Sequence, residues 1–102
     1  DDMQTEARNT PTDNLKAASS CALAAPHFEK KDPVFARWCR NSAIEDFQFA
    51  IDLLDTQRTE QNETELYALA TVTAMRLYRL TQDVYYLDWA TRLENPPTRF
   101  LL

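Results

Sequence analysis

The sequence contains no glycine, although an average chain of its 102 residues would hold roughly seven. Glycine supplies the positive-φ positions of tight hairpins and helix C-caps, so a meander of strands is disfavoured. The P-loop, the dinucleotide-binding fingerprint, the serine elbow and the calcium loop all require glycine and are excluded with it. The absence favours helices joined by short polar connections.

Positive charge and long apolar runs are also scarce. The net charge is −5, so nucleic acids and anionic membranes would be repelled by most of the surface. The longest dense apolar run, residues 66–80, contains Arg76 and Arg79 and is too short to cross a bilayer. We therefore expect no nucleic-acid partner and no transmembrane segment.

Residues for catalysis or metal binding are few. His27 is the sole histidine, and two cysteines with one histidine are too few for a zinc site. A pairing of His27 with a cysteine nucleophile is conceivable, but a solvated loop histidine is the simpler interpretation. The carboxylate pairs of the second predicted helix lie on its polar side, and nothing in the sequence indicates a cleft around them. We expect no catalysis, no metal and no cofactor.

The apolar pattern predicts an all-α fold, a compact bundle of about four helices in one domain. Residues 1–12 hold almost nothing apolar and are expected to form a disordered N-terminal arm. The bundle is expected over residues 13–97, followed by a C-terminal tail over residues 98–102. We expect a small hairpin of two helices, to which two longer helices are added.

The boundaries of the first two helices are marked by proline. The first is expected from residues 12–13 to just before Pro26, because a residue that precedes proline resists the α conformation. The second is expected to begin with Asp32 as N-cap and Pro33 at the first helical position, and to end near Thr56.

The last two helices are marked by polar caps. Asn62 followed by Glu65 resembles a capping box ahead of the apolar residues 66–80. Asp83 can cap a fourth helix, which the Asn-Pro-Pro sequence at residues 95–97 should stop.

Apolar residues of the second helix separate into two stripes. The first is predicted to face the core: Ala36, Cys39, Ala43, Phe47, Ala50, Ile51 and Leu54. The second lies well round the helix: Phe35, Trp38, Phe49 and Leu53. A helix this widely apolar contacts more than one neighbour or a partner, and core burial of the aromatic residues remains the competing interpretation. The fourth helix is expected to bury Tyr86, Trp89, Ala90 and Leu93.

Cys21 and Cys39 lie at nearly equal distances from the connection between the first two helices. In an antiparallel hairpin both sulfurs would stand at similar height on the shared face, a geometry that permits a disulfide. Closing this loop would stabilise the fold by about 3 kcal/mol. We expect the disulfide, and with it a periplasmic or secreted protein whose signal peptide has been removed; two buried free thiols are the alternative.

Acidic residues concentrate between residues 45 and 65, where seven acids accompany one basic residue. Asp52 and Asp55 lie near a helix C-terminus, where the helix dipole disfavours anions. A basic partner surface would explain them. The predicted partner-binding residues are therefore Phe35, Trp38, Phe49, Glu45, Asp46, Asp52 and Asp55.

The sequence thus predicts a small extracytoplasmic helical protein that binds another protein. An adaptor, a chaperone-like pilot and an inhibitor of the immunity type all suit a compact acidic helical domain. The alternative from another class is a carrier that holds an apolar small molecule between its helices. A homodimer whose seam is the aromatic stripe is a third interpretation.

Overall fold

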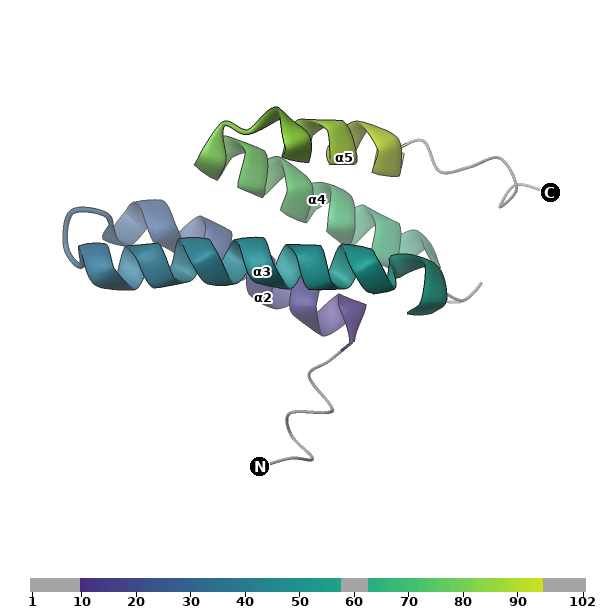
Figure 1. Ribbon diagram of the computed structural model, residues 1–102, viewed down its shortest axis with the longest axis horizontal. Coiled ribbons are helices and arrows are strands. Elements are labelled where there is room, and N and C mark those ends of the chain that lie inside the picture. Colours follow the sequence, from purple (N-terminus) through teal and green to yellow (C-terminus); the bar gives the residue numbers. More distant parts are fainter. Residues whose placement is uncertain (1–9, 58–62, 95–102) are drawn as a thin grey trace, which may run out of the picture.

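The computed structural model describes residues 10–57 and 63–94, and every regular element in these ranges is an α-helix. The elements are α2 (Pro11–Phe28), α3 (Pro33–Gln57), α4 (Glu63–Thr81) and α5 (Val84–Glu94). α2 and α3 form one hairpin, α4 and α5 form a second, and α2 also packs against α4 (Figure 1). The predicted all-α bundle of about four helices is confirmed.

The relative helix lengths differ from the prediction. The first hairpin contains the longest helix, α3 with 25 residues, whereas α4 has 19 and α5 only 11. α3 ends at Gln57, close to the expected end near Thr56, so the description of the first hairpin as small was wrong although the predicted bounds of its second helix were nearly right. The arm was expected over residues 1–12, but residues 11 and 12 already belong to α2. Residues 1–9 of the expected arm, the Asn62 cap, the Asn-Pro-Pro stop and the C-terminal tail lie outside the described residues.

Three helices begin at a polar N-cap. The Asp32 carboxylate accepts a hydrogen bond from the backbone N–H of Phe35 at 3.1 Å, and the Asp83 carboxylate accepts one from Tyr85 at 2.9 Å, as the sequence predicts. α2 begins slightly earlier than expected, because Thr10 caps it through a 3.1 Å bond from the N–H of Asp13.

α2 does not stop before Pro26 but continues to Phe28. Proline in a helix interior removes a backbone donor and crowds the preceding turn. Pro26 lies in the last turn, where few helical hydrogen bonds remain to be lost, and its carbonyl still accepts from the N–H of Glu29 at 3.4 Å. The predicted boundary was therefore wrong by one short turn.

In the connection between α4 and α5, a residue other than glycine occupies the left-handed position after the helix. Gln82 adopts a left-handed conformation with φ of 60°, the position that glycine normally fills after a helix. Its N–H bonds the carbonyl of Tyr78 at 2.7 Å, and its side chain bonds the carbonyl of Arg79 at 3.1 Å. These bonds offset a conformational cost of about 1–2 kcal/mol for a residue with a Cβ.

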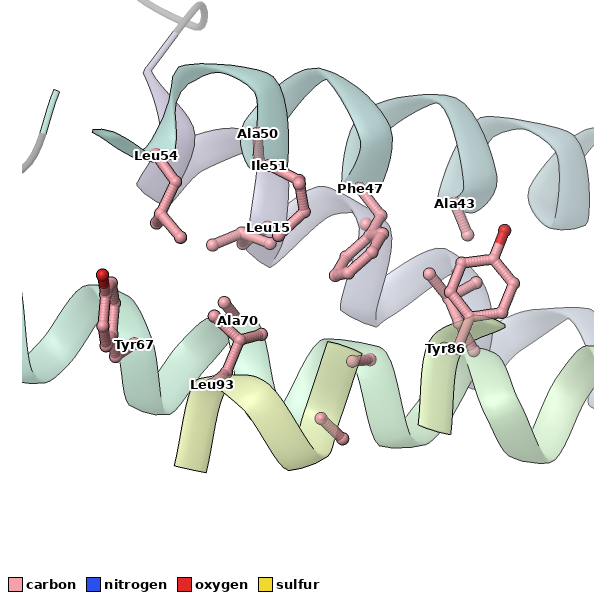
Figure 2. Close-up of a cluster of buried hydrophobic side chains, with 14 of the residues drawn as sticks. Leu15, Ala43, Phe47, Ala50, Ile51, Leu54, Tyr67, Ala70, Tyr86 and Leu93 are labelled. Atoms are coloured by element: carbon pink, nitrogen blue, oxygen red, sulfur yellow. The ribbon is translucent and has the colours of Figure 1, made fainter. Parts of the chain in front are cut away.

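The core lies between the two hairpins (Figure 2). Phe47 is fully buried on α3, and its ring meets that of Tyr86 on α5 edge-on at 5.6 Å. The face of α2 that enters the core is made mostly of small side chains, which lets α3 approach closely. The whole predicted inner stripe of α3 is buried: Ala36, Cys39, Ala43, Phe47, Ala50, Ile51 and Leu54.

Candidate functional site

The side of α3 opposite the core carries exposed aromatic and acidic side chains. We call it the outer stripe; it consists of Phe35, Trp38, Ser42, Glu45, Phe49 and Asp52, which follow one another at spacings of three and four residues. This spacing keeps side chains on one side of a helix, and the stripe extends about 26 Å along the axis. It resembles the seam that one helix presents to another.

Aromatic exposure is greatest at the end of the outer stripe nearest the α2–α3 connection. Trp38 is 59% exposed and Phe35 is 39% exposed, and their rings stack with centroids 5.9 Å apart. Phe28, at the end of α2, meets Phe35 edge-on at 4.9 Å. Phe49, about three turns beyond Trp38 along α3, is 42% exposed. None of the three predicted stripe aromatics is therefore a core residue in this structure.

Among the described residues, no basic side chain forms an ion pair with the acidic members of the outer stripe. Within the described residues, the ion pair that forms joins Arg92 to Asp88 on α5, and none involves Glu45 or Asp52. Asp52 instead accepts a 3.0 Å hydrogen bond from the side-chain amide of Gln48. That amide in turn accepts a 2.7 Å bond from the Tyr85 hydroxyl on α5. Asp52 is thereby positioned by neutral groups, and its charge stays available to a partner.

Asp46 lies apart from the outer stripe. Its side chain is half-buried towards α2, where burial first and the Glu45 carboxylate second raise its pKa. The structure therefore separates Asp46 from Glu45 and Asp52, although the sequence places all three in one acidic group. The side chain of Asp55 lies outside the described part of α3.

Cys21 and Cys39 are free thiols in the structure, Cys21 half-buried on α2 and Cys39 buried on α3. The predicted disulfide clip is therefore not supported as part of the fold. Burial raises the pKa of Cys21, and the neighbouring Cys39 and Asp46 raise it further by charge. Packing, rather than a covalent bond, joins α2 to α3 here.

Neither a membrane span nor a metal cluster is found in the residues that the structure describes. No helix there is long and apolar enough to cross a bilayer. No group of three or more histidine, cysteine or acidic side chains is arranged there to hold a metal ion. His27 lies exposed near the end of α2, where its ring meets that of Phe28 at 5.0 Å.

Sequence reasoning missed part of the exposed surface on and beside the outer stripe. The half-buried Ser42 completes the spacing of the stripe, and the half-buried Phe28 and the strongly exposed Val34 extend its apolar end. The spacing of three and four residues from Phe35 to Asp52 was the signal that could have identified Ser42. Phe28 belongs to another helix, so only the fold brings it to Phe35.

Comparison with known proteins gives no further assignment. Neither the protein-family models, nor the curated proteins, nor the solved structures include a match to this chain.

Proposed function

We propose that this chain is a non-catalytic module that binds another protein through the outer stripe of α3. The observation that carries the proposal is the exposure of Trp38 and Phe49 on a helix whose other face fills the core. Tryptophan and other aromatic residues dominate the energetics of protein interfaces, whereas an exposed stacked pair contributes little to a monomer. An adaptor, a pilot or an inhibitor would use such a surface.

The chemistry of the outer stripe specifies a basic amphipathic helix as the partner element. Side chains spaced three and four residues apart fit the grooves of a second helix. Apolar residues of the partner would cover Phe35, Trp38 and Phe49. Lysine or arginine side chains would meet Glu45 and Asp52, which have no internal counter-ion in the described residues.

A second copy of the chain is a poorer occupant of the outer stripe. The stripe is centred between residues 43 and 44, so an antiparallel two-fold pairing would place the Glu45 residues of both copies near its middle. Their heights along the helices would differ by only about 4.5 Å. A parallel pairing would bring Glu45 to Glu45 and Asp52 to Asp52. Both arrangements bring like charges together, which is unfavourable.

The carrier function is not favoured by the core. Phe47, Leu15, Leu66 and Leu77 are buried to 1% exposure or less and occupy the space between the hairpins where a ligand would lie. The hollows that we describe lie at the surface, between helix ends or along α5. A carrier normally surrounds most of its ligand.

Photo-crosslinking in an extract of the native source tests the proposed function. A benzoylphenylalanine in place of Trp38 is expected to form one dominant adduct with a second protein. The matched control is the same replacement at Val72, an exposed apolar residue of α4 outside the stripe, which should not form that adduct. An adduct of two 11.8 kDa chains would instead identify the outer stripe as a dimer seam.

We also propose that the protein works in the periplasm or outside the cell, and that Cys21 and Cys39 become oxidised to a disulfide there. Both are free thiols in the structure, on two helices that pack against each other, so the disulfide requires the two sulfurs to approach more closely than they do here. The raised pKa of Cys21 keeps its thiolate scarce. The proposed oxidation therefore uses a disulfide-carrying oxidant of that compartment, which takes up the two electrons and two protons and is reduced to a dithiol by exchange.

The mass of the denatured native protein after alkylation tests this location. No label before reduction and two labels after it are expected. Two labels without reduction would contradict both the disulfide and the location, while the outer stripe as a binding surface would be unaffected.

A further inference from the structure

A second surface, formed by α2 and α4, has the opposite charge to the outer stripe. We call it the arginine groove; it is a hollow of about 300 Å³ lined by Ala22, Leu23, Pro26, Arg76, Arg79 and Leu80. Its lining contains no residue of α3 and no acidic residue. Small and aliphatic side chains form its floor, and two guanidinium groups from successive turns of α4 line one side.

The two arginines of the groove differ in their burial and in their hydrogen bonds to the rest of the protein. Arg76 is half-buried and donates one hydrogen bond to the hydroxyl of Ser19 on α2. Arg79 is exposed, and its guanidinium forms no ion pair within the described residues. The helix dipole favours a cation in the last turn of α4, which accounts for the position of Arg79. It does not supply an acceptor for the guanidinium N–H groups of Arg79.

More positive charge lies just beyond Leu80. A second hollow shares Leu80 with the arginine groove and adds Arg37 and Arg40 from α3, along with Glu29, which directly follows α2. Arg40 donates a 3.4 Å hydrogen bond to the carbonyl of Leu80 and so ties α3 to the end of α4. This end of the bundle is therefore basic, although the whole chain has a net charge of −5.

Part of the apolar floor of the arginine groove is exposed in the part of the chain that the structure describes. Leu23 is 57% exposed at the edge of the groove, and Leu80 is half-buried at its end. An occupant that fits must bring an aliphatic side chain for the floor and carboxylates for Arg76 and Arg79. Planar guanidinium groups bind carboxylates through paired hydrogen bonds, which gives such a contact direction as well as strength.

Other anionic ligands fit the arginine groove less well. Single-stranded nucleic acid is held by aromatic rings on which bases stack, and the groove lining contains none. A free fatty acid would leave most of its tail in water, because the hollow lies open at the surface between two helices.

We propose that the arginine groove binds an acidic segment of a partner protein, with leucine-like side chains on the floor and carboxylates at Arg76 and Arg79. The inference does not depend on the outer stripe, since the two surfaces share no residue. Together they would make the chain a two-sided adaptor, with an acidic face for a basic helix and a basic groove for an acidic one.

The test is the binding of a fluorescein-labelled peptide of three Glu-Leu-Ala-Glu repeats, followed by fluorescence anisotropy at 0.15 M salt, where the Debye length is about 8 Å. We expect Arg79→Glu to raise the dissociation constant by about tenfold or more. Arg92→Glu makes the same change of charge on α5 and should change it by less than about twofold. Circular dichroism checks that both variants keep the helical fold.

Several outcomes would overturn the proposal. These are the absence of peptide binding to the unmodified chain, equal losses in the Arg79 and Arg92 variants, or tighter Arg79-dependent binding of an oligothymidine of the same length. Leu23→Gln is expected to raise the dissociation constant of the peptide by about threefold to tenfold. This loss would show that the peptide contacts the apolar floor and is not held by charge alone. The double variant Glu45→Lys and Asp52→Lys should not weaken the binding of this peptide. A negative result for the arginine groove can therefore be distinguished from a negative result for the outer stripe.

Discussion

Replacing Phe47 by alanine is expected to lower the free energy of unfolding by about 3–5 kcal/mol. The Phe47 side chain is fully buried and lies between the two hairpins, where its ring contacts that of Tyr86. The substitution removes the ring from the core and leaves a cavity that four packed helices cannot close. A domain of this size has a total stability of roughly 5–15 kcal/mol, so a large share would be lost. Urea unfolding followed by circular dichroism measures the change.

Phe49→Ala is the matched control, because it makes the same substitution two residues away on the opposite face of α3. Phe49 is 42% exposed, and its loss should cost less than about 1.5 kcal/mol. Equal losses at Phe47 and Phe49 would contradict the division of α3 into an inner and an outer face.

The second large effect is expected for the double charge reversal Glu45→Lys and Asp52→Lys. The ligand is a fluorescein-labelled peptide of three Lys-Leu-Ala-Lys repeats, the simplest basic amphipathic helix. Each substitution replaces an attractive charge by a repulsive one, so we expect the dissociation constant to rise by about a hundredfold at low salt. Fluorescence anisotropy at two salt concentrations measures both the loss and its electrostatic origin.

A control variant with the same change of net charge distinguishes a local effect of the outer stripe on peptide binding from an effect of net charge alone. Asp13→Lys with Glu94→Lys changes the charge equally, and both side chains are exposed on helices other than α3. This variant should lose less than about fivefold in affinity at physiological salt, because distant charges are screened. Similar losses in the two double variants would show that only net charge attracts the peptide.

The helical architecture was readable from the sequence because local signals agreed with the global pattern. Asp32 followed by Pro33 gave the start of α3, and Asp83 gave the start of α5. The inner stripe of α3 could be assigned from its helical period alone. These signals act within one helix, so they do not require knowledge of which helices pack together.

Tertiary packing decided the features that the sequence left open or gave wrongly. Phe35 and Trp38 could be core or surface residues, and only the placement of α2 and α4 on the other side of α3 leaves them exposed. Asp46 falls in an acidic run but turns towards α2. In the sequence, Arg76 and Arg79 only interrupt an apolar helix and do not indicate a groove. The groove forms because the fold places Leu23 of α2, which is far away in the sequence, beside these two arginines.

The site of peptide contact is the most direct test of the outer stripe as a docking surface. A titration of the isotope-labelled chain with the unlabelled Lys-Leu-Ala-Lys peptide, followed by backbone amide NMR, locates that contact. We predict that the largest shifts occur at Phe35, Trp38, Ser42, Glu45, Phe49 and Asp52, and that the amides of α4 around Val72 change little. Shifts spread evenly over all four helices, or confined to α4 and α5, would contradict the proposed function.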